Sequence, residues 1–477
     1  MATLEKAVVK GLAEDKGLYM PERINPLPQE FFDHIQDMTF QEIAFEVAKG
    51  FFGEDIPADD LKQIVYDTLS FDVPAVKVAP ATDGRGAIYS LELFHGPTLA
   101  FKDVGARFMA RLLQHFTGKD ELNVLVATSG DTGKAALEGF RDVDHTRILV
   151  FYPRDGVSDV QKLQMRTQLG NNVGVCAVKG NFDDAQTGVK QIFTQCQGKA
   201  LPFKLSSANS INWGRLVPQI VYYISAYCDM IENGSIKNGD EINIVVPTGN
   251  FGNILAAYYA KCMGVPVKKL ICASNANNVL TDFLTNGIYD RNRKFFTTTS
   301  PSMDILISSN LERLLYVLAG QEKTASFMKE LNEKGSYKVD DKTLSLIKEN
   351  FSAYYCSEDE TSKTIKDTFD KYGYLIDTHT AVGVKCAKQF EEESNDGLFT
   401  LVASTASPYK FTANVFSSLS GETVDDEFLC LEKTSEYTKT EIPSPLAKLK
   451  DKKVRFDKVI DPCDMITEVL KYIGLEK

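Results

Sequence analysis

The sequence predicts an α/β fold whose core is a parallel β-sheet covered by helices, and three observations support this expectation. Between residues 121 and 275, short β-branched runs alternate with amphipathic segments of helix length, which is the pattern of parallel strands joined by helical crossovers. One more apolar run, at residues 397–404, follows a long polar stretch. Residues 1–85 contain helical segments broken by proline and glycine, so they predict a separate domain before the core.

Six segments are expected to form core strands because each is apolar, rich in β-branched residues and followed by a turn: 122–128, 147–152, 173–178, 241–246, 269–274 and 397–404. Residues 40–52 and 59–69 are expected to form helices. We therefore divide the chain into an N-terminal domain (1–85), a core with both lobes (86–320), a polar helical insertion rich in Lys and Glu (321–371), a return to the core (372–420) and a C-terminal segment (421–477).

The composition excludes several classes of partner. The chain has 477 residues and a formal net charge of −12, which argues against binding to nucleic acid or to an anionic membrane. A small-molecule substrate fits better, and an anionic ligand would have to be held by local amides or a few placed cations. We expect a monomer or a homodimer.

The cysteines and the hydropathy pattern indicate a reduced, cytoplasmic protein. The nine cysteines are scattered, without a CxxC pair or a histidine at metal-ligand spacing, so we expect free thiols and no metal. No apolar run approaches the roughly 18 residues that a membrane span requires, and the first residues contain no apolar signal-like segment.

Ligands of open α/β sheets bind at the carboxyl ends of the strands, so the turns there are the first candidates for a site. The turn Thr128–Gly133 places hydroxyls and small residues at the start of a helix, which suits a carboxylate or a phosphate. The alternative is a tight turn whose Ser129 and Asp131 only cap the helix.

A second turn, Pro247–Asn253, follows a predicted strand directly and precedes another helix. Its two glycines three residues apart leave the backbone amides unobstructed, which is the form of a phosphate cradle. The spacing matches neither a P-loop nor a dinucleotide-binding fingerprint. The alternative is a purely structural turn.

Lys102 is expected at the first position of a helix whose buried face begins at Phe101. A positive charge at this end opposes the helix dipole, so the position lowers the pKa of the amine. A neutral amine is what a lysine needs to attack an aldehyde. The alternative is an ordinary surface lysine.

These features together indicate pyridoxal phosphate, which presents one aldehyde, one phosphate and one ring to be fixed. Thr405 lies in Ala403–Phe411, just after the last predicted strand. Its hydroxyl could bond the ring nitrogen without stabilising the protonated form of that nitrogen. The alternative is a capping threonine.

The chain resembles the threonine synthases of the long bacterial and fungal type, which are fold type II pyridoxal-phosphate enzymes. Eight segments carry the resemblance in the family order: GLAEDKGLYMPERI (11–24), FHGPTLAFKDVGARFMARLL (94–113), ATSGDTGKAA (127–136), SSANSINWGRLVPQIVYY (206–223), PTGNFGNILAAYYAKCMG (247–264), SPSMDILISSNLERLLY (300–316), DTHTAVG (377–383) and STASPYKF (404–411). The resemblance implies a two-lobed core like that of the tryptophan synthase β subunit.

The resemblance also implies roles for individual residues. Lys102 would bind the cofactor aldehyde, Thr405 would face the pyridine nitrogen, and the phosphate would be cradled by Gly249, Asn250, Phe251, Gly252 and Asn253. Asp131 falls where related enzymes often place an asparagine beside the ring hydroxyl, so this carboxyl would be either protonated or off the ring. Two positions depart from the family pattern, Ser407 in place of His and Thr378 in place of Pro.

The implied reaction converts O-phospho-L-homoserine and water into L-threonine and phosphate. It needs a pocket for the leaving phosphate, for which the candidates are Asn209, Ser210, Asn212 and Arg215. The α-carboxylate would lie against Ser129, Gly130 and Thr132, near Thr98 and His95, and we assign His95 no acid–base role. The alternative for Arg215 is an ion pair with an acidic neighbour.

Two other functions stay open at this level. One is another fold type II reaction, such as that of a serine or threonine dehydratase, which lacks a second phosphate pocket. The other is a catalytically silent threonine-synthase-like protein that acts by binding, although the presence of Lys102 and of the loop at 249–253 speaks against it.

Overall fold

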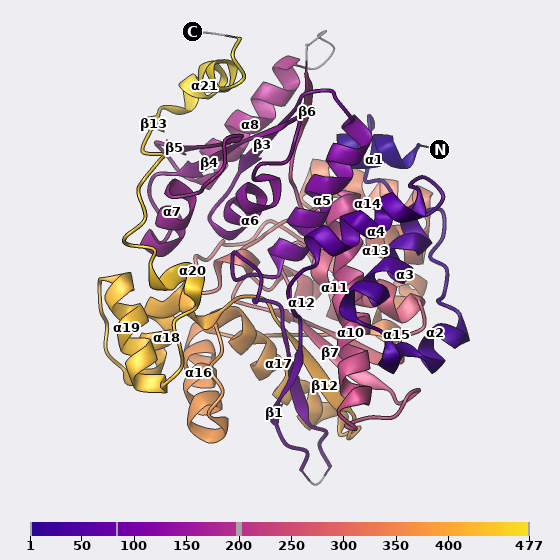
Figure 1. Cartoon of the computed structure of the whole chain (residues 1–477). Coiled ribbons are helices and arrows are strands. Elements are labelled where there is room, and N and C mark those ends of the chain that lie inside the picture. Colours follow the sequence, from indigo (N-terminus) through magenta and orange to yellow (C-terminus); the bar gives the residue numbers. More distant parts are fainter. Residues whose placement is uncertain (1, 83, 197–202, 476–477) are drawn as a thin grey trace.

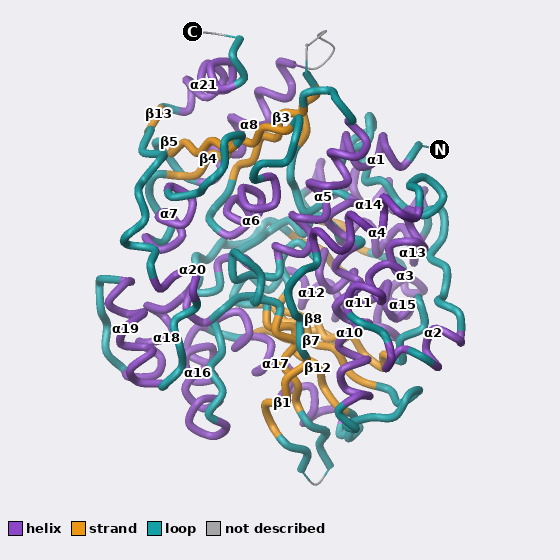
Figure 2. Tube along the Cα trace, viewed as in Figure 1, coloured by secondary structure: helices purple, strands orange, loops and turns teal. Residues whose placement is uncertain are grey.

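The computed structural model describes residues 2–82, 84–196 and 203–475. Two separate sheets form the two lobes of the core (Figures 1 and 2). The larger has six strands in the order β1 (Ala75–Ala79), β2 (Ile88–Glu92), β12 (Phe399–Ser404), β7 (Ile242–Pro247), β8 (Val267–Ser274) and β11 (Phe351–Tyr355). Only the β1–β2 pair is antiparallel.

The smaller sheet is wholly parallel. Its order is β13 (Val459–Ile460), β5 (Val173–Val178), β4 (Thr146–Pro153), β3 (Leu122–Ala127) and β6 (Lys204–Ser206). The six predicted core strands are therefore confirmed, and they divide between the two lobes.

Both sheets are covered on two faces, as the apolar strand sequences require. In β7, Ile244 and Val246 pack with α10 (Pro218–Glu232) and α11 (Gly252–Cys262), whereas Val245 belongs to the cluster under α17 (Thr378–Ser394). The alternation places the two clusters on opposite faces. The smaller sheet is covered in the same way by helices α5 (Lys102–Thr117), α6 (Asp131–Phe140), α7 (Asp159–Arg166), α8 (Phe182–Cys196) and α21 (Met465–Tyr472).

The N-terminal region is helical, as predicted. It consists of α1 (Leu4–Lys10), α2 (Gln29–Asp33), the short 3₁₀ helix η1 (Ile35–Asp37), α3 (Phe40–Phe52) and α4 (Ala58–Thr68). Helix α3 begins at a capping box between Thr39 and Glu42. Its buried face packs on α10 and α4, and α4 packs on α5.

The predicted polar helical insertion at 321–371 is wrong in one respect, because part of it is sheet. Helices α14 (Gln321–Lys334), α15 (Asp341–Asn350) and α16 (Glu358–Tyr372) alternate with β10 (Ser336–Lys338) and β11. Strand β10 pairs with β9 (Ile288–Asp290), whereas β11 pairs in parallel with β8 at the edge of the larger sheet. The sequence did not predict this strand because an edge strand is partly exposed to solvent and therefore lacks a continuous apolar run. The half-exposed Tyr355 shows this exposure.

The C-terminal segment connects both lobes. Helix α18 (Thr412–Ser420) packs between α16 and α19 (Glu427–Thr438), and α20 (Ser444–Ala447) follows. The chain then returns to the smaller sheet through β13, η4 (Pro462–Asp464) and α21. Figure 1 shows this path in yellow along one side of the molecule. The remaining elements are α9 (Trp213–Leu216), α12 (Val279–Asn286), α13 (Leu311–Ala319), η2 (Pro301–Met303) and η3 (Pro408–Phe411).

All nine cysteines are free thiols, as predicted. In the part of the chain that the structure describes, His, Cys, Asp and Glu side chains form no group suited to a metal ion. Within the same residues, no helix is both long and apolar enough to cross a membrane.

Candidate active site

The loops at the carboxyl ends of β3, β7 and β12 meet around Lys102, the first residue of α5. The segment before Lys102 is held against the end of β12, where the N–H of Leu93 donates to the carbonyl of Ser404 at 3.0 Å and that of Phe101 donates to Thr405 at 2.9 Å. The end of the sheet therefore fixes where the lysine enters the site.

The Lys102 amine lies in a mostly dry, polar environment, with 12% of its side chain exposed. Its Nζ donates to Ser302 Oγ at 3.1 Å and lies 3.9 Å from Asp131 Oδ2. Burial lowers the pKa of Lys102 to about 8, and the charges of Lys410 and Arg215 add to this effect, whereas Asp131 opposes it. The lowered pKa was predicted, but its main cause is burial rather than the helix dipole.

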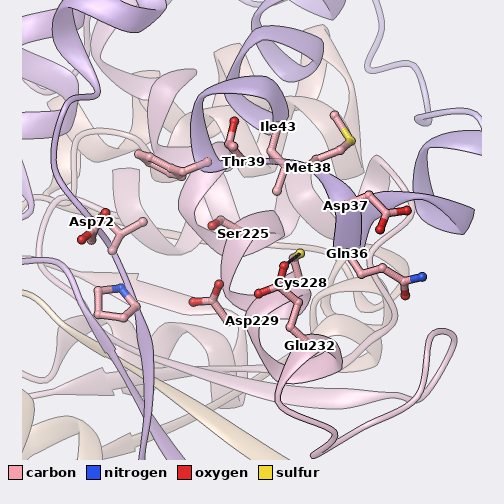
Figure 3. A pocket seen from close by; sticks show the side chains of 13 residues that line it. Gln36, Asp37, Met38, Thr39, Ile43, Asp72, Ser225, Cys228, Asp229 and Glu232 are labelled. Carbon is pink, nitrogen blue, oxygen red and sulfur yellow. Dashed lines mark hydrogen bonds between the residues drawn. The ribbon is translucent and has the colours of Figure 1, made fainter.

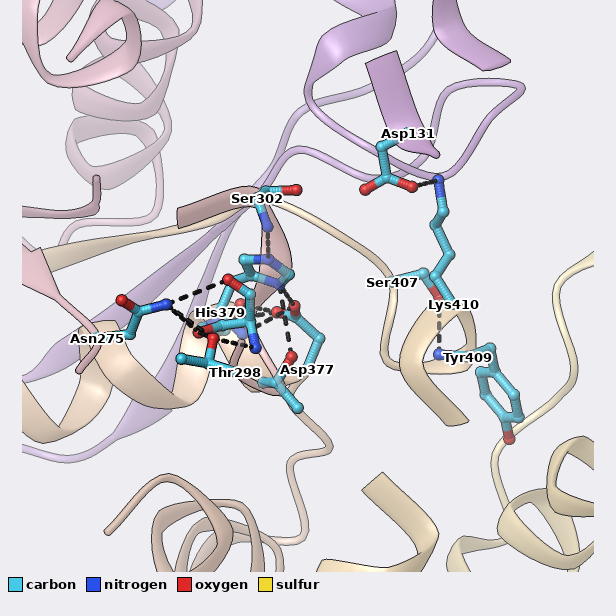
Figure 4. A network of polar contacts seen from close by, with 12 residues as sticks. Asp131, Asn275, Thr298, Ser302, Asp377, His379, Ser407, Tyr409 and Lys410 are labelled. Carbon is cyan, nitrogen blue, oxygen red and sulfur yellow. Dashed lines mark hydrogen bonds and ion pairs between the residues drawn. The ribbon is translucent and has the colours of Figure 1, made fainter. Parts of the chain in front are cut away.

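Asp131 forms a buried ion pair with Lys410, a residue that sequence reasoning missed. Lys410 Nζ lies 2.6 Å from Asp131 Oδ1 (Figure 4). It also donates to the carbonyl of Thr98 at 2.9 Å. Gln161 also donates to Asp131 Oδ1, at 2.7 Å. Burial disfavours the carboxylate, but Lys410 and Lys102 outweigh it and hold the pKa of Asp131 below its usual range. The carboxyl is therefore ionised. Of the two predicted possibilities, a protonated carboxyl and one that lies off the ring, the ion pair with Lys410 disfavours the first.

The only sequence signal for Lys410 was its place in the segment after the last strand. From the sequence, Lys410 would be taken for an ordinary surface lysine. In the structure it lies in η3 with its side chain fully buried. Ser407 caps this 3₁₀ helix by accepting from the N–H of Tyr409 at 3.4 Å. The departure at Ser407 thus supports the turn that carries Lys410.

The turn 249–253 has the features of an anion cradle. Phe251 adopts a left-handed conformation with φ 61° immediately before α11 begins at Gly252. A Cβ atom at Gly249 would lie 2.7 Å from the carbonyl oxygen of Ser302, so only glycine fits there. The first N–H groups of α11 have no carbonyl partner within the helix and are available to a phosphate.

Side chains anchor this turn from behind. Asn253 Oδ1 accepts from the hydroxyls of Tyr222 and Tyr223, and its buried Nδ2 has no partner among the described residues. The Phe251 ring is buried in the core, so only its backbone can face a ligand. Asn250 is exposed, and its carbonyl accepts from Asn310.

Thr405 is buried, and its hydroxyl makes no hydrogen bond with any described residue. Its carbonyl is occupied by Phe101 N–H. A hydroxyl left without a partner at the end of β12 fits the predicted contact with a ring nitrogen.

In the turn after β3, the Thr128 hydroxyl, rather than the side chain of Ser129 or Asp131, caps the start of α6. Gly130 has φ 145°, and a Cβ there would lie 2.7 Å from Gln161 Oε1. Thr128 Oγ1 accepts from the amides of Gly130 and Gly133, while Ser129 is exposed and Thr132 half-buried.

Thr98 and His95 have positioning contacts. The Thr98 hydroxyl and amide donate to the two oxygens of the buried Asp103, at 2.6 and 2.8 Å. Thr98 is fully buried, so its side chain orders the loop before Lys102 rather than meeting a substrate. His95 Nε2 lies 2.7 Å from Glu92 Oε2.

Arg215 is a buried cation without an acidic partner among the described residues. Its Nη1 donates to the carbonyl of Ala208 at 2.7 Å, and its Nε has no partner. Burial lowers the pKa of Arg215 to about 10. The alternative of an ion pair with an acidic neighbour is not what the structure shows.

The neighbours of Arg215 differ in role. Asn212 caps α9 by accepting from Gly214 at 2.9 Å and donates to the carbonyl of Val8 at 2.8 Å. Both ends of its amide are engaged, so it positions Arg215 rather than contacting a substrate. Asn209 is exposed and Ser210 half-buried, so both can face a ligand.

A second polar network, also missed in the sequence, joins Ser302, His379 and Asp377 (Figure 4). Ser302 links it to Lys102. The N–H of Ser302 donates to His379 Nε2 at 3.2 Å, and His379 Nδ1 lies 2.7 Å from Asp377 Oδ2. His379 Nε2 thus accepts from an amide, while Nδ1 faces a carboxylate oxygen. The departure at Thr378 leaves this arrangement intact.

A cavity elsewhere in the molecule is unsuited to an anionic cofactor. It measures about 480 Å³ and lies between η1, the start of α3 and α10 (Figure 3). Four carboxylates line it, from Asp37, Asp72, Asp229 and Glu232, and its 13 lining residues, all of them described, include no Lys, Arg or His.

The comparisons with known proteins agree with this site. Residues 1–69 match the family Threonine synthase N terminus, residues 71–402 match Pyridoxal-phosphate dependent enzyme, and residues 380–470 match Threonine synthase, C-terminal. Fold and site together define a pyridoxal-phosphate-dependent enzyme of fold type II, with pyridoxal 5′-phosphate as its cofactor.

The chain belongs to the threonine synthase family. It is 37% identical to threonine synthase of Saccharomyces cerevisiae, over 88% of this chain and 87% of that one. It is also 39% identical to human threonine synthase-like 1, over 87% of this chain but 58% of the human protein. The crystal structure of PLP-bound threonine synthase from Brucella melitensis matches with a TM-score of 0.87 and 35% identity, over 98% of this chain and 96% of that one.

Proposed function

We propose that the protein converts O-phospho-L-homoserine and water into L-threonine and phosphate. The observation that carries the proposal is Arg215. A buried guanidinium without a carboxylate partner is costly unless an anion neutralises it, and one of its donors is unused. A second phosphate, distinct from that of the cofactor, satisfies this requirement.

The described residues fit the cofactor in three places. Lys102 would hold its aldehyde carbon, the amides at 249–253 its phosphate, and Thr405 its ring nitrogen. When bound, the cofactor supplies an electron sink for carbanions formed beside the amino group. Asp131, held ionised by Lys410, would lie beside Lys102. An ionised carboxylate can only accept, so it would contact the ring hydroxyl only as the acceptor of that hydroxyl's proton.

The remaining roles belong to the chain itself. Lys102, with its lowered pKa, would move protons at Cα and Cβ of the substrate. Ser302 would orient the Lys102 amine, and the amides of Ser129 and Thr132 would bind the α-carboxylate. The amide of Gly130, also predicted to contact the substrate, already donates to Thr128 Oγ1. Arg215, Asn209 and Ser210 would receive the phosphate that leaves Cγ.

The experiment is an assay of phosphate and threonine released by the purified holoenzyme from O-phospho-L-homoserine. Equal amounts of the two products are expected. The same protein is then given L-serine and L-threonine, and keto acid is measured. Keto acid without phosphate release would point to a dehydratase and contradict the proposal. No turnover, together with the absorbance band of lysine-bound cofactor, would point to a silent binding protein.

A further inference from the structure

A second cavity, outside the site around Lys102, is lined by three arginines. It measures about 430 Å³ and lies where the end of α4, the middle of α5 and the end of α6 meet. Arg107 and Arg111 come from α5, and Arg141 follows α6. The only carboxylates among its lining residues are Asp67 and Glu138. A cluster of cations is unexpected in a chain of net charge −12.

Arg107 is fixed in position without being neutralised. Its Nη2 donates to the carbonyl of Asp67 at 3.1 Å and to Ser70 Oγ at 3.2 Å. The guanidinium also lies 5.6 Å from the ring centre of Phe71. These contacts orient the fork, but no carboxylate in the described chain forms an ion pair with it.

Arg111 lies one helical turn after Arg107 and has even fewer contacts. Its Nη1 donates to Gln114 Oε1 at 3.1 Å, and it forms no ion pair with any described residue. Like charges four residues apart on a helix repel each other and destabilise it. Burial lowers the pKa of Arg107, the charges of Asp103 and Glu138 oppose this effect, and the charge of Arg111 adds to it.

The acidic residues of the cavity are already occupied. Glu138 forms ion pairs with Lys134 and Arg141, both at 3.4 Å. Asp67 Oδ1 accepts from Gln63 at 2.7 Å. The two guanidinium groups of α5 therefore keep most of their N–H donors for a ligand.

We propose that this cavity binds a small molecule that carries a phosphoryl or diphosphoryl group. The planar forks of two arginines one turn apart match the oxygens of such a group, and the volume lies in the range of small-molecule sites. Pro97 lines the same cavity. It precedes Thr98, which bonds Asp103 and Lys410, so an occupant would contact the loop that leads to Lys102.

The test is a calorimetric titration of the holoenzyme with sodium pyrophosphate and with sodium orthophosphate, at constant ionic strength. Saturable binding of at least one of them is expected. Arg111→Gln should weaken it by about tenfold or more, because it removes charge-assisted hydrogen bonds. Tighter binding of pyrophosphate would indicate a diphosphoryl ligand, and equal binding a single phosphoryl group.

Two control variants separate this cavity from other anion sites. Arg154→Gln changes an exposed arginine paired with Asp155, outside the cavity, and should bind as the unchanged protein does. Arg215→Gln should also bind phosphate or pyrophosphate at the cavity, with the same dependence on Arg111, even where its turnover is changed. The proposal is wrong if neither phosphate nor pyrophosphate binds the unchanged holoenzyme saturably. It is also wrong if Arg111→Gln and Arg107→Gln both bind these anions as tightly as the unchanged holoenzyme does.

Discussion

Single side chains around Lys102 show how burial and charge together set reactivity. A lysine on an exposed helix end would hold its proton up to about pH 10, whereas burial brings the pKa of Lys102 to about 8. The neutral fraction near neutral pH is thereby roughly a hundredfold larger. The charge of Asp131 limits the decrease and that of Lys410 adds to it, so the three charged groups form one electrostatic unit.

Two substitutions in this unit are predicted to move the pKa of Lys102 in opposite directions. Lys410→Met removes a nearby positive charge, so the pKa rises, whereas Asp131→Asn removes the opposing carboxylate, so it falls, each by about one pH unit. The measurement is the pH dependence of the rate at which cofactor-free protein takes up pyridoxal phosphate, followed by absorbance. In the unchanged protein this rate should rise with pH and level off above about pH 8. Midpoints that moved in the same direction would contradict the coupling.

Arg215→Gln is predicted to weaken binding of O-phospho-L-homoserine. Charge-assisted hydrogen bonds contribute about 1.5–3 kcal/mol, so KM should rise by about ten- to a hundredfold with a smaller change in kcat. Arg215→Lys, which keeps the charge but loses the fork, should recover part of the loss. An unchanged KM in Arg215→Gln would remove Arg215 from the phosphate pocket.

At the scale of elements, the turn at 249–253 packs against β11, a strand that lies about a hundred residues later in the chain. The Phe351 ring of β11 lies 5.9 Å from the ring of Phe251, with only 2% of Phe351 exposed. Strand β11 thus supports the left-handed residue before α11 from inside the core. The amides of the cradle depend on this packing, because a non-glycine residue holds a left-handed conformation only where its surroundings fix it.

Phe351→Ala is predicted to lower the free energy of unfolding by about 3–5 kcal/mol, as expected for a buried aromatic ring. It should also weaken the affinity for pyridoxal phosphate, because the turn at 249–253 loses its support. Tyr355→Ala on the same strand, where half of the side chain is exposed, should change stability by less than about 0.5 kcal/mol. Urea unfolding and cofactor titration of both variants measure the difference, and equal effects would contradict this role of β11.

For the whole molecule, the net charge of −12 has a kinetic consequence. An acidic surface repels a phosphate substrate at long range, and salt screens this repulsion. Under the proposed function, capture would depend on Arg215 and on backbone amides, and a buried group such as Arg215 is less affected by salt.

The value of kcat/KM for O-phospho-L-homoserine should therefore stay constant or rise, by less than about threefold, as ionic strength increases to 0.15 M. Measurements in a series of NaCl concentrations at fixed pH test this, with a neutral salt of a different anion as the control for specific anion effects. A steep fall with both salts would indicate steering by a basic surface and contradict the expectation.

The sequence by itself determined the local parts of this protein. Alternating apolar runs located six core strands, and the turns after them identified Lys102, the cradle at 249–253 and Thr405 as candidates, because strand propensity, glycine spacing and helix starts are encoded within a few residues. The tertiary structure alone decided which distant groups meet. It buried Lys410 against Asp131, brought Ser302 and His379 to Lys102, engaged Thr98 and Asn212 in structural bonds, and placed β11 in the larger sheet. These outcomes depend on desolvation and on contacts across hundreds of residues, which no local pattern carries.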